Sequence, residues 1–216
     1  DFKKRGAYWS TPDDVVNTAQ LIRTSVDTKS YDHLLIYAHG GLNDPGASAK
    51  RIRALKEGFK RNGIYPFHIM YDTGLVEELK DSVQRAFSGK RTEGFFTDWR
   101  DKLIERSDRL IEDLVRKPVT PIWEEMKNDA RRPFDSKKGG KIGDGLFVIK
   151  TFADALLDTH LKIHLAGHST GAVVLGHLLT ALDVLDIPDL IENCNLMAPA
   201  CCIDFYREHY EPSLQQ

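Results

Sequence analysis

Apolar and polar positions follow one another along the chain in blocks that predict four β-strands. Each block is short, rich in β-branched or aromatic residues, and bounded by polar residues, glycine or proline. The blocks cover residues 34–38, 64–71, 162–166 and 191–198. In the first block the apolar residues are consecutive, which predicts a strand that is buried on both faces of a sheet.

The segments between these strands show the spacing of amphipathic helices. Thr11 and Pro12 open the first one, because Thr suits the cap position and Pro suits the first turn, where an N–H has no partner within the helix. Further helices are predicted at 45–62, 172–179 and 203–210. Strands that alternate with helices indicate an α/β fold, and we expect residues 1–216 to form a single domain.

A long segment without a strand pattern separates the second strand from the third. It covers residues 75–160 and contains predicted helices at 76–87, 98–117, 120–130 and 146–157. We therefore expect a helical insertion before the third strand. It serves either as a lid that carries substrate selectivity or as a structural layer packed on the sheet.

The third strand runs into the pentapeptide Gly167-His168-Ser169-Thr170-Gly171, which an apolar helix follows. Strand, sharp turn and helix are the context in which a Gly-x-Ser-x-Gly sequence presents a serine at the apex of a strained turn. The two glycines lack a Cβ atom, so strand and helix can approach closely. Ser169 is thus a candidate nucleophile, and the Thr170 amide is a candidate donor to an oxyanion.

The first strand ends in His39-Gly40-Gly41-Leu42, a second junction that bears on function. Open α/β sheets bind ligands at the carboxyl ends of their strands, where this glycine-rich turn is predicted to lie. Strands one and three are expected to be parallel neighbours, so that the Gly41 amide, helped by that of Leu42, would complete an oxyanion hole with the Thr170 amide. Alternatively, the segment is an ordinary glycine-rich turn between strand and helix.

Composition narrows the classes of function. The formal net charge is −2, from 30 Lys and Arg against 32 Asp and Glu, so no excess of positive charge predicts binding to nucleic acid. Apolar runs are much shorter than the roughly 20 residues that span a bilayer. The three cysteines are an odd number clustered near the carboxyl end, which does not suggest a disulfide framework. We therefore expect a cytoplasmic protein. Because the sequence begins with Asp1 and not Met, the natural amino terminus is expected to lie elsewhere.

With these two junctions and this order of strands and helices, residues 30–205 resemble the α/β-hydrolase superfamily, and most closely its esterase and lipase-like members. The resemblance implies a three-layer α/β/α fold with a mostly parallel sheet. It also implies Ser169 as the nucleophile and the amides of Thr170 and Gly41 as the oxyanion hole. No metal site and no cofactor are predicted, because no histidine lies at metal-ligand spacing from a second His, Cys or acid.

The catalytic acid and histidine of that superfamily usually follow strands later than 191–198. The sequence ends at Gln216, before either position, and we expect both groups to lie beyond it. A minority of the superfamily places the acid just after the strand equivalent to 191–198, which makes Asp204 a candidate. His209 is the candidate base, because it is the only histidine after the helix that follows Ser169.

The expected reaction is acyl transfer to water. Ser169 attacks a carboxylic ester or thioester, and water then releases the acyl group from the serine. Two other interpretations stay open: a catalytically inactive binding module on the same fold, and an acyltransferase or peptidase that uses the same nucleophile. The expected partner is a small acyl ester. The acyl chain length and the oligomeric state are not predicted.

Overall fold

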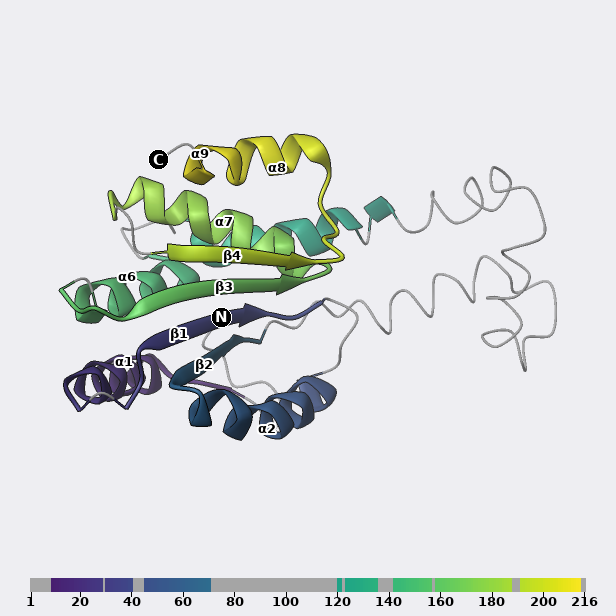
Figure 1. Cartoon of the computed structure of the whole chain (residues 1–216). Coiled ribbons are helices and arrows are strands. Elements are labelled where there is room, and N and C mark those ends of the chain that lie inside the picture. Colours follow the sequence, from purple (N-terminus) through teal and green to yellow (C-terminus); the bar gives the residue numbers. More distant parts are fainter. Residues whose placement is uncertain are drawn as a thin grey trace, which may run out of the picture. The chain divides into compact units, whose positions relative to one another are not determined.

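The computed structural model describes residues 9–28, 30–40, 45–70, 120–121, 123–135, 142–156, 158–187 and 191–214 (Figure 1). Strands and helices alternate along the chain. They are α1 (Pro12–Asp27), β1 (His33–Ala38), α2 (Pro45–Arg61), β2 (Ile64–Ile69), η1 (Arg132–Phe134), α6 (Asp144–Leu156), β3 (Lys162–His168), α7 (Gly171–Val184), β4 (Ile191–Met197), α8 (Ile203–His209) and α9 (Glu211–Leu214).

All four predicted strands are confirmed, with ends that differ from the prediction by at most two residues. The helices predicted at 45–62, 172–179 and 203–210 correspond to α2, α7 and α8, and that at 146–157 corresponds to α6. Residues 120, 121 and 123–131 are helical as well. The helices predicted at 76–87 and 98–117 lie outside the described residues.

The four strands form one parallel sheet in the order β2-β1-β3-β4. In the sheet, β2 lies on one side of β1, and β3 and β4 lie on its other side. Strand order therefore reverses between β1 and β3, and the carboxyl ends of these two neighbours define the switch point at which open α/β sheets bind ligands.

The core lies on one face of the sheet. Alternate residues of β1 and β3, among them Leu34, Ile36 and Leu165, are buried there together with the apolar faces of α1, α6 and α7. Because connections between parallel strands are right-handed as a rule, α2, which contacts β2, is expected on the opposite face from α7. The described residues thus form an α/β fold with a parallel sheet flanked by helices, which is compatible with a three-layer arrangement.

One prediction about β1 is wrong in part. The consecutive apolar residues predicted burial on both faces, but only every second residue of β1 is fully buried. Leu35 and Tyr37 point to the other face, where they are partly exposed and have His164 and Ala166 as partners on β3. Among the described helices, those that build the apolar core contact only the first face, so the second face carries polar residues beside its apolar ones.

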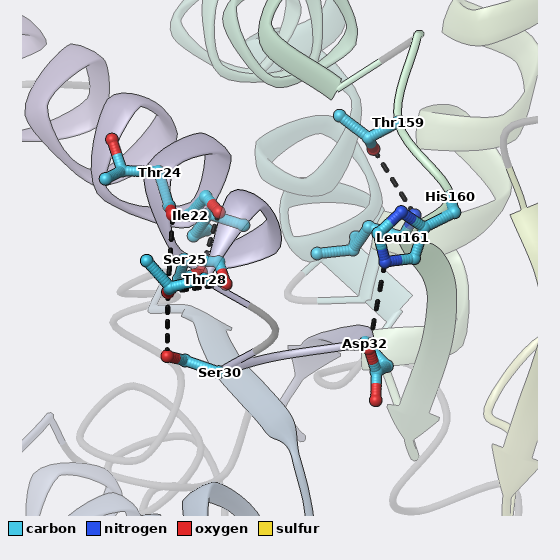
Figure 2. A network of polar contacts seen from close by, with 9 residues as sticks. All are labelled: Ile22, Thr24, Ser25, Thr28, Ser30, Asp32, Thr159, His160 and Leu161. Carbon is cyan, nitrogen blue, oxygen red and sulfur yellow. Dashed lines mark hydrogen bonds and ion pairs between the residues drawn. The ribbon is translucent and has the colours of Figure 1, made fainter.

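Local contacts fix the ends of several elements. Thr11 and Asp14 form a reciprocal cap at the start of α1: the Asp14 amide donates to Thr11 Oγ1 at 3.1 Å, and the Thr11 amide donates to Asp14 Oδ2 at 2.8 Å. Beyond the end of α1, Thr28 bonds to Ser30 (Figure 2). Gly63, two residues beyond the end of α2, has a φ of +70°, a conformation that suits glycine after a helix.

Residue contacts divide the chain into two compact units, Asp1–Asp72 with Asp129–Gln216, and Thr73–Asn128. The first unit contains the whole described sheet. Most of the second unit, and with it most of the predicted insertion 75–160, lies outside the described residues. The described end of that insertion, α6, packs against α1 and α7 as a structural helix of the core.

Candidate functional site

Ser169 occupies the turn between β3 and α7, and its backbone is strained. Its φ is +53°, in the left-handed region that residues with a side chain rarely adopt. Such a conformation costs on the order of 1–3 kcal/mol and persists only where surrounding contacts enforce it. This turn at Ser169, called here the elbow, has the strained conformation that the sequence predicted between a parallel strand and a helix.

The glycines on either side of Ser169 allow the close packing that the turn needs. A Cβ atom on Gly171 would lie 2.2 Å from the carbonyl oxygen of Ala38, at the end of β1. A Cβ atom on Gly167 would lie 3.0 Å from a methyl group of Leu175 on α7. A side chain at Gly171 would thus collide with backbone, and one at Gly167 would be tightly packed, in agreement with the close approach that the sequence predicted.

Contacts from the end of β4 and from the segment after it hold the strained turn in place. The Ser169 amide donates to the Met197 carbonyl at 3.0 Å, and the Ala200 amide donates to the Ser169 carbonyl at 3.0 Å. Ala198, between these two partners, has a φ of +44°. Because the backbone of Ser169 is bonded on both its N–H and its C=O, the turn is fixed by tertiary structure as well as by its own sequence.

The turn after β1 lies directly against Ser169. A Cβ atom on Gly40 would lie 3.2 Å from Cβ of Ser169 and 3.1 Å from Nδ1 of His168. The two junctions singled out in the sequence are thus brought together at the switch point of the sheet. Gly41 and Leu42, the predicted oxyanion donors from this turn, lie outside the described residues.

Thr170, the other predicted oxyanion donor, is buried and forms the N-terminal cap residue of α7. Its amide belongs to the first turn of a 14-residue helix whose dipole places partial positive charge at this end. The first turn of α7 contains no acidic residue. Developing negative charge beside Ser169 would therefore be favoured by the helix.

The described residues do not supply a base for the Ser169 hydroxyl. Ser169 is partly exposed, and in the described part of the chain no side chain hydrogen-bonds to its Oγ. His209 instead lies between α8 and α7, where its Nδ1 is 2.7 Å from Thr180 Oγ1. Thr180 is nine residues beyond the start of α7, about 14 Å along the helix from the elbow.

Asp204, the predicted acid, has its ion-pair partner within α8 and not at the elbow. It is in the first turn of α8 and highly exposed, and it faces Arg207 at 4.0 Å. The structure therefore does not bring Asp204, His209 and Ser169 into one hydrogen-bonded relay. His209 contacts Phe205 and His177, and this aromatic group packs α8 on α7.

Three further histidines lie near the carboxyl ends of the strands. His39 is buried and donates from Nδ1 to the Gly40 carbonyl at 2.7 Å. Burial lowers its pKa, which the hydrogen bond to Gly40 partly opposes. Burial, with a smaller effect of the His39 charge, lowers the pKa of His68 to about 4, so His68 is neutral at pH 7. Among the described residues, His68 Nε2 and His168 Nδ1 are buried without a hydrogen-bond partner.

Sequence reasoning missed two parts of this arrangement. Gly40 was identified as part of a flexible turn, but its contact with Ser169 depends on the register of β1 against β3, which no local pattern shows. The role of Met197 and Ala200 in holding the elbow was also missed. A signal for it existed, because Ala198 and Pro199 end β4 at the same edge of the sheet as Ser169.

No protein-family model, curated protein or solved structure matches the chain. The described helices include none that is long and apolar enough to cross a membrane. What the fold and the site define is a parallel α/β protein with a strained serine at its switch point.

Proposed function

We propose that the chain is a serine hydrolase of the α/β-hydrolase type that acts on carboxylic esters or thioesters. The observation that carries this proposal is the strained backbone of Ser169, held against Gly40 at the switch point of a parallel sheet. An ordinary strand-to-helix turn has no need of a left-handed serine, and such strain clusters at functional sites.

In the proposed reaction, Ser169 Oγ bonds to the carbonyl carbon of the substrate while a base removes the hydroxyl proton. The carbonyl oxygen becomes an oxyanion, which the Thr170 amide and the Gly41 amide stabilise. The base then gives its proton to the leaving alkoxide or thiolate, and an acyl group remains on Ser169. Water attacks this acyl group in the second half of the reaction and regenerates the serine.

The base and the acid that orients it are proposed to come from outside the described residues. His209 is bonded to Thr180, and none of the described histidines bonds to Ser169 Oγ. A serine hydroxyl without a base is a weak nucleophile at neutral pH. The 216-residue chain by itself is therefore expected to turn over activated esters slowly or not at all.

A second candidate function is a catalytically inactive binding module on the same scaffold. The absence of a base beside Ser169 within the described residues favours it. Turnover by the longest natural form of the protein separates the candidates. Hydrolysis of short activated esters or thioesters that disappears in Ser169→Ala and persists in Ser30→Ala, at an exposed serine, supports the hydrolase.

Product analysis in the same assay tests the remaining alternatives. Alcohol acceptors and short peptides are offered beside the esters, and the products are identified by mass spectrometry. Free acid as the main product supports hydrolysis. Acyl transfer to the alcohol or cleavage of the peptide identifies an acyltransferase or a peptidase with the same nucleophile. Hydrolysis that is equal in the wild type and in Ser169→Ala contradicts the proposal.

A further inference from the structure

Two histidines meet at the amino ends of β1 and β3, at the opposite end of these strands from Ser169. His33 is the first residue of β1 and His164 is the third residue of β3. His33 pairs with Lys162, so His164 lies two residues further along on the same face of the sheet. Nδ1 of His33 is 2.9 Å from Nε2 of His164, and the ring centroids are 5.0 Å apart.

A separation of 2.9 Å between two imidazole nitrogens suits two arrangements. In one, a single proton is shared, with one ring donating and the other accepting. In the other, both nitrogens bind one metal ion. With metal–nitrogen bonds of about 2.0–2.1 Å, two neighbouring ligands are about 2.9 Å apart at a right angle and about 3.3 Å apart at a tetrahedral angle. A metal ion could thus replace the shared proton at an unchanged distance between the nitrogens, provided that the two rings rotate so that both nitrogens point at the ion.

The charges around the pair are nearly balanced, so they do not oppose a cation. Glu192 of the neighbouring β4 is close enough to interact with both histidines, although its pKa is lowered mainly by the hydrogen bond and charge of Lys162. The ammonium group of Lys162 lies 2.9 Å from a Glu192 carboxylate oxygen, which offsets its positive charge. Asp32 adds a further carboxylate at this edge and faces His160 at 3.8 Å (Figure 2).

The histidine pair is partly buried, which limits its motion and leaves it accessible to ions. Within the described residues no group of three His, Cys, Asp or Glu side chains could hold a metal ion together. The other ligands of an ion on the pair are therefore water molecules. Such a site exchanges its metal readily and differs from a closed structural zinc site with four protein ligands.

We propose that His33 and His164 form a two-histidine site for a divalent first-row transition metal ion, which bridges β1 and β3 at the amino edge of the sheet. Imidazole nitrogen is a ligand that Zn²⁺, Ni²⁺ and Cu²⁺ share, and the order of affinity is highest for Cu²⁺. The right-angle separation also matches the square-planar preference of Cu²⁺ and Ni²⁺. Five residues of extended chain, about 16 Å, separate His164 from Ser169, so the ion takes no part in chemistry at the serine.

The test uses the full chain, purified without a polyhistidine tag and stripped of metal with a chelator. Thermal unfolding and titration calorimetry are measured with Ni²⁺ and Zn²⁺, because an ion that binds only the folded chain raises the melting temperature. His33→Gln and His164→Gln each remove one ligand. His160→Gln is the matched control, since His160 is an exposed histidine at the same edge of the sheet.

We expect Ni²⁺ to raise the melting temperature of the wild type and of His160→Gln. Loss of a group that only orients a ligand costs roughly 10–100-fold in metal affinity, so loss of a ligand should cost about tenfold or more. Equal affinities in the wild type and in the two ligand variants would overturn the proposal. So would the absence of any binding by the wild type.

Electron paramagnetic resonance of Cu²⁺ on the wild-type chain keeps the proposal testable if a variant does not fold. The expected spectrum is tetragonal, with hyperfine splitting from two imidazole nitrogens at one equivalent of Cu²⁺. A spectrum without imidazole nitrogen, or one that stays unchanged in His33→Gln, means that the ion binds elsewhere and that the pair only shares a proton.

Discussion

At the scale of single residues, the site depends on positions where a side chain is either strained or excluded. Ser169 carries a side chain in a conformation that suits glycine, and Gly171 lacks one where any side chain would meet the backbone of β1. These two opposite requirements, two residues apart, define the elbow more sharply than the Gly-x-Ser-x-Gly pattern does. Each leads to a prediction about stability.

Ser169→Gly is expected to be more stable than Ser169→Ala by about 1 kcal/mol, because glycine removes the left-handed strain that alanine retains. Urea unfolding of both variants measures the difference. Both lose the hydroxyl, so neither should react as a nucleophile. If glycine gives no advantage over alanine, the strain assigned to residue 169 is not present in the folded protein.

Gly171→Ala is expected to lower the free energy of unfolding by about 3 kcal/mol or more. The new Cβ atom would lie 2.2 Å from the Ala38 carbonyl oxygen, so α7 or β1 must shift. Gly58→Ala is the matched control, because no atom lies within 4 Å of its Cβ position in α2. That substitution should stabilise the chain by about 0.5–1 kcal/mol, since alanine favours the helix. Similar effects of the two changes would contradict the proposed close approach of α7 to β1.

At the scale of elements, the sequence predicted most of what surrounds the site. The strands and the main helices could be read from apolar spacing, and the start of α1 from Thr11 and Pro12, because these signals are local. The sequence also placed strands one and three side by side, and the pairing of β1 with β3 confirms this. The register of that pairing, the contact of Gly40 with Ser169 and the meeting of His33 with His164 could not be predicted. They depend on residues that lie more than 120 positions apart in the sequence.

The same dependence on distant residues explains why the sequence could not decide whether Asp204 and His209 form a hydrogen-bonded relay with Ser169. The sequence offered Asp204 and His209 because of their order along the chain, whereas their contacts depend on how α8 packs. In the structure Phe205 fills the space above Gly176, where a Cβ atom would lie 2.5 Å from its ring. That packing directs His209 to Thr180. The helix thus has an evident structural role.

His209→Ala is expected to lower the free energy of unfolding by about 1–2 kcal/mol through loss of the hydrogen bond to Thr180 and of ring packing. It should leave the reactivity of Ser169 unchanged. Glu208→Ala, at an exposed neighbouring position, should change stability by less than about 0.5 kcal/mol. Loss of Ser169 reactivity in His209→Ala, with unchanged stability, would restore His209 as the candidate base.

At the scale of the whole molecule, the fold combines a core on one face of the sheet with histidines partly buried elsewhere. Burial is the main cause that lowers the pKa of His68 on β2 and of His177 on α7, each from 6.5 to about 4. The unfolded chain therefore binds protons at these two residues at a higher pH than the folded chain does. Their contribution to stability is present above pH 6.5 and is lost as the pH falls toward 4.

The free energy of unfolding should consequently decrease between about pH 6.5 and pH 4. Urea unfolding at a series of pH values measures this decrease. His177→Gln should make the dependence on pH shallower, because it removes one of the groups that bind protons on unfolding. A slope that is the same in His177→Gln and in the wild type would contradict the assignment.

The central claim is that Ser169 is a nucleophile, and covalent labelling with a fluorophosphonate tests it most directly. The probe is applied to the 216-residue chain and to the longest natural form of the protein, and the modified residue is identified by peptide mass spectrometry. We predict one label on Ser169 in the longest form, no label in Ser169→Ala, and full labelling in Ser30→Ala. An unlabelled Ser169 in the longest form, or a label on another serine, would contradict the account.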